Sequence, residues 1–96
     1  MSETVKAAVA ALNSKLDGRG FAGVAKFVIE GKGSLVVDEN GARVGDDAAD
    51  VTLTADTETF RAIIDGEKNP TTAFMTGKLK VDGDMGAAMR LAGVLS

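Results

Sequence analysis

The side chains that could carry out chemistry in this chain are carboxylates, lysines and hydroxyls. The sequence contains no histidine, cysteine, tryptophan or tyrosine. It therefore lacks the usual general base near neutral pH, the thiol nucleophile and the common nitrogen and sulfur metal ligands. An enzyme that acts on an acyl substrate through Asp or Lys stays open as an alternative, and it would need such a group inside its binding site. The inward-facing positions contain none, so we predict a protein that is not an enzyme, with no catalytic residue and no cofactor.

Two acidic clusters raise the question of a metal site. Asp46 and Asp47 fall in a predicted loop with Asp50 at the start of the strand that follows, and Asp82 and Asp84 lie on either side of a glycine. Neither set has the length or the terminal bidentate glutamate of a calcium-binding loop. We interpret both clusters as solvated turns and predict no metal ligands.

Phosphate binding has weak support in the sequence. Thr76-Gly77-Lys78 resembles the end of a phosphate-binding loop, but Thr72 stands where the first glycine of that loop belongs. Lys78 and Lys80 could attract a carboxylate or phosphate head group. Lysines on the outer face of a strand more often serve solubility.

Length and composition narrow the class of protein. The 96 residues suffice for one domain, 1–96, and 45% hydrophobic with 26% charged residues is typical of a folded globular chain. The net charge of -3 is spread without a basic cluster, which excludes nucleic acid as a partner. No apolar run is long enough to span a membrane, and the first residues do not resemble a secretion signal. The final residues do not resemble a peroxisomal address, so we expect a cytoplasmic location.

Periodicity predicts a helix followed by strands. Apolar residues repeat at three- and four-residue steps up to Gly18, as in an amphipathic helix, and alternation with period two then indicates strands. Asn40-Gly41 is a strong signal for a tight hairpin. The strands are expected around residues 25–29, 34–38, 42–44 and 50–54.

The second half of the chain predicts three helices and one more strand. Asp56 is a suitable N-cap for a helix that ends at Gly66, and Asn69-Pro70 opens a short helix. A last strand over Lys78 to Asp82 leads into a terminal helix. This order of elements predicts an α+β fold, a mostly antiparallel sheet with helices on one face.

The terminal helix, Met85 to about Leu95, has Arg90 as its one charged residue. A surface helix normally keeps about half of its circumference polar. A domain of this size has little material with which to enclose such a helix, which favours a ligand or a partner on its apolar surface. Met75 and Met89, together with Met85, suit a surface that must fit several shapes.

An ordinary core is the alternative interpretation, because Met and Leu at helical spacing are also typical of interior packing. Gly86 and Gly93 lower the stability of the terminal helix by roughly 1 kcal/mol each relative to Ala. This favours a helix that can move and open a binding site.

Several short segments occur in a characteristic order in the second half of the chain. They are Ala49-Asp50 at the start of a strand, a capped helix ending at Asp65-Gly66, Asn69-Pro70 followed by Ala73-Phe74, and Gly77-Lys78-Leu79-Lys80 running into Gly83-Asp84-Met85. In order and spacing, these segments resemble the sterol carrier protein 2 family. The resemblance covers Ala49 to Leu91 and extends more loosely into the N-terminal half.

The resemblance implies a five-stranded sheet with helices packed on one face, enclosing an apolar tunnel for fatty acids, fatty acyl-CoA, sterols and similar lipids. The function that it implies is non-catalytic lipid binding and transfer, with transient membrane contact. A lipid-binding accessory or scaffold domain for a lipid-metabolising enzyme is the alternative. Carried over by position and facing direction, the lipid-binding residues are Phe60, Ile63, Ile64, Phe74, Met75, Leu79, Val81, Met85, Met89 and Leu95.

Overall fold

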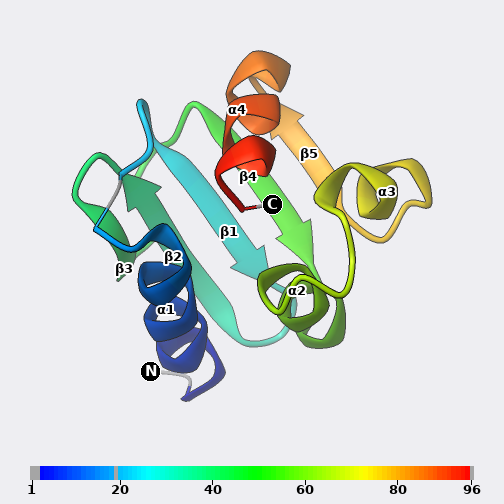
Figure 1. Cartoon of the computed structure of the whole chain (residues 1–96), viewed down its shortest axis with the longest axis horizontal. Coiled ribbons are helices and arrows are strands. Elements are labelled where there is room, and N and C mark those ends of the chain that lie inside the picture. Colours follow the sequence, from blue (N-terminus) through cyan, green and yellow to red (C-terminus); the bar gives the residue numbers. More distant parts are fainter. Residues whose placement is uncertain (1–2, 19, 96) are drawn as a thin grey trace.

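Five strands form one sheet in the order β3-β2-β1-β4-β5, and the helices pack on one of its faces (Figure 1). The structure is a computed structural model that describes residues 3–18 and 20–95, with Leu95 described by its backbone alone. Along the chain, the elements in this described part are α1 (Glu3–Leu16), β1 (Ala25–Ile29), β2 (Gly33–Asp38), β3 (Gly41–Val44), β4 (Val51–Ala55), α2 (Thr57–Ile64), α3 (Pro70–Met75), β5 (Lys80–Gly83) and α4 (Met85–Leu95).

Three of the four strand pairings are antiparallel, and the pairing of β1 with β4 is parallel. In β1, alternate residues face the helices, and Phe27 is paired with Leu35 of β2 on one side and Leu53 of β4 on the other. All three side chains are buried in the same core. The predicted α+β architecture, with a mostly antiparallel sheet covered by helices on one face, is confirmed.

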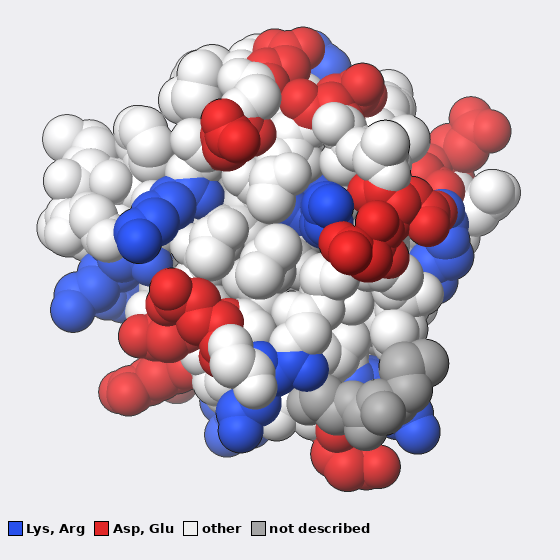
Figure 2. Space-filling view, turned by 180° about the vertical axis from the view of Figure 1, so that it is seen from behind, with Lys and Arg blue, Asp and Glu red and all other residues white. Residues whose placement is uncertain are grey.

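The parallel pairing requires the chain to cross the sheet between β3 and β4. This connection runs over the face opposite the helices, where the Lys26 ammonium lies 3.0 Å from a carboxylate oxygen of Asp46 and the Ser34 hydroxyl donates to the Gly45 carbonyl at 2.8 Å. Val36 is fully buried on this face although it lies outside the main core. Side chains of both charges are scattered over this side of the molecule (Figure 2).

The helices that follow β4 begin at the predicted caps. The Asp56 carboxylate accepts a hydrogen bond from the Thr59 amide at 2.7 Å, and the Asn69 side chain accepts one from the Thr71 amide at 2.8 Å. Pro70 occupies the first position of α3, where no amide donor is needed. These contacts satisfy amides that a helix cannot pair internally.

The last strand begins two residues later than the sequence predicts, at Lys80. The amides of Lys78 and Leu79 both donate to the Ala73 carbonyl, at 2.9 and 3.1 Å, and therefore close the end of α3. Gly77 makes this turn possible with a φ of 78°. The chain therefore begins to pair with β4 only after Leu79. The side chain of Leu79 stays buried.

Candidate functional site

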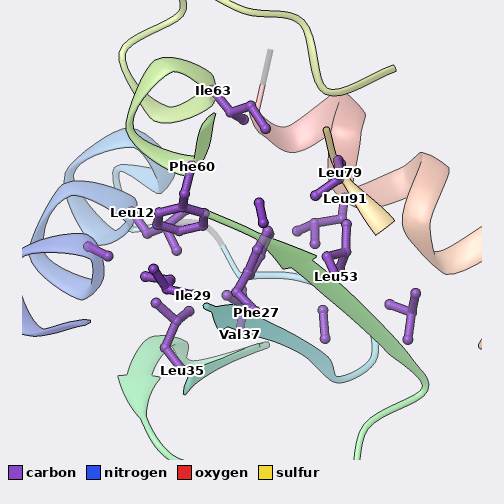
Figure 3. Close-up of a cluster of buried hydrophobic side chains, with 14 of the residues drawn as sticks. Leu12, Phe27, Ile29, Leu35, Val37, Leu53, Phe60, Ile63, Leu79 and Leu91 are labelled. Atoms are coloured by element: carbon purple, nitrogen blue, oxygen red, sulfur yellow. The ribbon is translucent and has the colours of Figure 1, made fainter. Parts of the chain in front are cut away.

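An apolar groove with a volume of about 270 Å³ lies among the sheet, α3 and α4. Its floor comes from the sheet, through Phe27 of β1 and Leu53 of β4, and α2 contributes Ile63. These three side chains are at least 96% buried, and Figure 3 shows Phe27, Leu53 and Ile63 among the other core side chains. The walls come from α3, from Leu79 and β5, and from one side of α4.

The rim of the apolar groove is unusual because large apolar side chains stand in solvent there. Phe74 is 41% exposed, Met75 78%, Met85 46% and Met89 71%. In the described part of the chain, these four are the large apolar side chains that are exposed to solvent, and all four line the groove. Exposed apolar side chains gathered around one hollow are typical of a binding surface.

The structure brings most of the predicted site residues together. Those that line the apolar groove are Ile63, Phe74, Met75, Leu79, Val81, Met85 and Met89. Phe60 and Ile64 lie on the other side of α2, where they face α1. The side chain of Leu95 lies outside the described residues. Assignment of a lipid-binding role to these residues remains a prediction.

The groove also contains residues that sequence reasoning missed. The additional lining residues are Phe27, Leu53, Pro70, Thr71, Ala88, Leu91 and Ala92. Alternation already placed Phe27 and Leu53 on the inner face of the sheet. Alternation identifies an inward side chain, but it does not distinguish contact with protein from contact with an open hollow.

A second hollow of about 260 Å³ lies between α1 and α2, and we call it the helix-pair hollow. Ala7, Ala8 and Ala11 of α1 line one side, while Phe60 and Ile64 of α2 line the other. Its lining also includes polar side chains from both helices, namely Thr4, Thr57, Arg61 and Asp65. This hollow therefore has a mixed character, in contrast to the apolar groove.

Helix α2 separates the two hollows and is anchored at its N-terminus. The amide and the hydroxyl of Thr59 donate to Asp56, and the nearby charges of Lys78 and Lys68 add to their effect, so the pKa of Asp56 lies below its ordinary value of 3.8. Phe60 of α2 also contacts the sheet. Its ring meets that of Phe27 in β1 edge to face, with centroids 5.1 Å apart. Such pairs stabilise a core beyond their area of contact.

Helix α4, which forms a wall of the groove, begins at Asp84. The carboxylate of Asp84 accepts hydrogen bonds from the amides of Gly86 and Ala87, at 2.8 and 3.3 Å. The amide of Asp84 donates to the Asp50 carbonyl at 2.9 Å, which ties the start of the helix to the beginning of β4. Ala87 and Leu91 then bury the inner side of α4 in the core.

The chemistry that the apolar groove offers is burial of apolar surface. Thr71 is the one polar side chain among its described lining residues, and no carboxylate or ammonium lines it. Asp46 and Asp47 pair instead with Lys26 and Arg43 on the opposite face of the sheet. Among the residues that the structure describes, no three acidic side chains are placed to hold a metal ion.

Within that same part of the chain, no helix has the length and apolar character needed to cross a membrane.

Comparison with known families gives a match over residues 4–96 to a family described as the SCP-2 sterol transfer family. Two curated relatives illustrate the match in sequence. Hydroxysteroid dehydrogenase-like protein 2 of Xenopus laevis is 35% identical over 103 aligned residues, which cover 99% of this chain and 24% of the relative. Sterol carrier protein 2 of Gallus gallus is 48% identical over 65 residues, which cover 67% of this chain and 11% of the relative.

The chain thus spans a quarter or less of the length of these relatives. Solved structures agree over nearly the whole fold. Sterol carrier protein 2 like 2 from Aedes aegypti has a TM-score of 0.79 at 25% identity and covers 95% of both chains. Sterol carrier protein 2 from the same species, solved in complex with the C16 fatty acid palmitate, has a TM-score of 0.77 at 27% identity and covers 100% of this chain and 97% of that one.

Proposed function

Because the chain belongs to the SCP-2 sterol transfer family, we propose that it is a non-catalytic lipid carrier that holds its ligand in the apolar groove. One observation carries this proposal. Phe74, Met75, Met85 and Met89 are exposed to solvent around a single hollow whose floor is entirely apolar. A ligand that covers these side chains removes from water an apolar surface that the chain itself leaves open.

The ligand class follows from the chemistry of the groove. Burial of each methylene group contributes about 0.8 kcal/mol, so a long acyl chain releases on the order of 10 kcal/mol before the cost of ordering is subtracted. The volume of about 270 Å³ lies just below the range of roughly 300 to 1,000 Å³ that ligand pockets usually have. A single acyl chain, as in the palmitate bound to the Aedes aegypti relative, is therefore the ligand that we favour.

Broad selectivity is expected for such a site. Burial depends on the area and shape of the ligand, and the groove lacks the directional polar contacts that would reject related lipids. Methionine side chains are unbranched and adapt their conformation to different partners. Met75, Met85 and Met89 can in this way follow ligands of different width.

Two measurements test this proposal. One identifies the bound ligand, and the other introduces a charged side chain at the rim of the apolar groove. Native mass spectrometry and lipid extraction of the purified protein should reveal a bound apolar compound. Met89→Glu, which puts a carboxylate at the rim of the groove, should weaken binding of a fluorescent fatty acid at least ten-fold, because a ligand that covers this position would remove the carboxylate from water. Ala48→Glu adds the same charge at an exposed position of the β3–β4 connection and should leave binding unchanged. Equal affinities of the two variants would contradict lipid binding in the groove.

A second candidate function rests on the lengths of the relatives. In the Xenopus laevis relative, whose name describes it as dehydrogenase-like, the matched region is 24% of the protein. We infer that a lipid-binding domain of this type also acts as an accessory unit, which presents its lipid to a lipid-metabolising enzyme. Co-purification of this chain with such an enzyme, with transfer of a labelled lipid between them, tests this role.

A further inference from the structure

Only a thin partition separates the apolar groove from the helix-pair hollow. Phe27 lines the groove, Phe60 lines the hollow, and the two rings are in contact. Ile63 and Ile64, which are neighbours on α2, likewise face different sides. In Figure 3, Phe60 points from α2 toward Phe27 and lies on the side of Leu12 of α1, whereas Leu79 and Leu91 lie on the far side of Phe27. The Phe27–Phe60 ring pair therefore lies between the two spaces.

The two spaces differ in polarity in the way that the two ends of an amphiphile differ. The apolar groove has Thr71 as its one polar lining residue, whereas the helix-pair hollow has Thr4, Thr57, Arg61 and Asp65 around a floor of alanines and Phe60. We propose, on the premise of the lipid-carrier function above, that the carboxylate of a single-chain lipid binds at Arg61 in the helix-pair hollow. The acyl chain passes the Phe27–Phe60 contact and fills the apolar groove.

Arg61 is suited to this role by its chemistry and its surroundings. Its guanidinium presents several N–H donors in a planar arrangement that matches a carboxylate. No ion pair joins Arg61 to an acidic side chain within the described residues, although Asp65 lines the same hollow one helical turn away. The Asp65 carboxylate opposes an anionic head group and thereby limits its affinity. This pair of opposite charges makes the proposal testable, because removal of each charge has an opposite effect.

The experiment compares palmitate with the uncharged alcohol of the same chain length on four proteins. Arg61→Gln should weaken palmitate binding roughly two- to five-fold, which is the size expected for a solvent-exposed ion pair, and Asp65→Asn should strengthen it. Both variants should bind the alcohol as the unchanged protein does. Arg90→Gln is the matched control, because Arg90 is exposed on α4 and lines neither space.

Carboxyl-labelled palmitate provides a second readout by NMR. Its carboxyl resonance should shift in Arg61→Gln and Asp65→Asn and stay in place in Arg90→Gln. If palmitate binds but neither charge variant at the helix-pair hollow changes its affinity or its resonance, the head-group assignment is wrong and the carrier function stands. An effect of Arg90→Gln on palmitate alone would also overturn the assignment, because it would place the head group beside α4. If the unchanged protein binds neither palmitate nor the alcohol, the carrier function itself fails.

The path of the acyl chain has its own test. Phe60→Leu reduces the partition while keeping an apolar side chain at the position, and it should increase the preference for long over short fatty acids. Leu35→Ala, a buried core change that lines neither space, controls for a general loss of rigidity. An unchanged chain-length preference in a folded Phe60→Leu protein would contradict a path past this ring.

Discussion

The side-chain amide of Asn13 in α1 exchanges two hydrogen bonds with the main chain of Ala42 in β3. The Ala42 amide donates to Asn13 Oδ1 at 2.8 Å, and Asn13 Nδ2 donates to the Ala42 carbonyl at 3.0 Å. Since β3 lies at the edge of the sheet, Asn13 occupies the position that a further strand would take. It fixes α1, and with it one side of the helix-pair hollow, against the edge of the sheet.

Asn13→Ala is expected to lower the free energy of unfolding by about 1 to 2 kcal/mol, because each of the two hydrogen bonds contributes on the order of 1 kcal/mol. Chemical denaturation measures this change. Ser14→Ala, at the exposed neighbouring position of α1, should cost little or nothing. Alanine favours a helix more than serine or asparagine does, so a loss of the same size in both variants would contradict a specific stabilising role of the contact with β3.

Leu91→Ala should change both stability and selectivity. Leu91 is fully buried and lines the apolar groove, so its truncation removes core contacts and widens the groove at the same time. We expect a loss of about 2 to 5 kcal/mol in the free energy of unfolding and a shift of ligand preference toward wider lipids. Leu35→Ala should cost a similar amount with no change in preference, because Leu35 lies outside the groove. Competition between a straight-chain acid and a sterol measures the preference.

Gly93→Ala and Gly86→Ala test whether α4 moves when lipid exchanges. A Cβ at Gly93 meets no atom within 4 Å, so alanine there should stabilise the helix by up to about 1 kcal/mol. At Gly86 the Cβ would lie 3.2 Å from Asp84 Oδ1, the atom that caps the helix, and the gain should be smaller. Stopped-flow displacement of a fluorescent fatty acid should be slower in Gly93→Ala. An unchanged rate in the stabilised protein would count against opening at α4.

Acid should destabilise the protein in part through Asp56. Its pKa is lowered in the folded protein, first by the hydrogen bond from the Thr59 amide, so the unfolded chain binds the proton more readily. The stabilising contribution is complete above the ordinary value of 3.8 and disappears as the pH falls through the lower folded pKa. Asp56→Asn retains a side chain that can cap α2, and it should flatten this part of the dependence of Tm on pH. Asp56→Ala should lower Tm at every pH.

Local patterns in the sequence were sufficient for most of the elements. Alternation in β1 and β4, the hairpin at Asn40-Gly41, and the caps at Asp56 and Asn69 appear in the structure where they were predicted. These features depend on neighbouring residues along the chain. The start of β5 was misplaced because two of its expected amides are used to close α3, a competition that no single segment reveals.

The sequence by itself determined the family, the inward faces of the strands and the excess of apolar side chains in the second half of the chain. Tertiary structure alone decided the parallel pairing of β1 with β4, the burial of Val36 under the β3–β4 connection, and the division of α2 between two hollows. Phe60, Ile63 and Ile64 share one helical face in sequence, yet Ile63 lines the groove while the other two face α1. The physical reason is that periodicity specifies which side chains leave water, whereas the packing of distant elements specifies what they meet there.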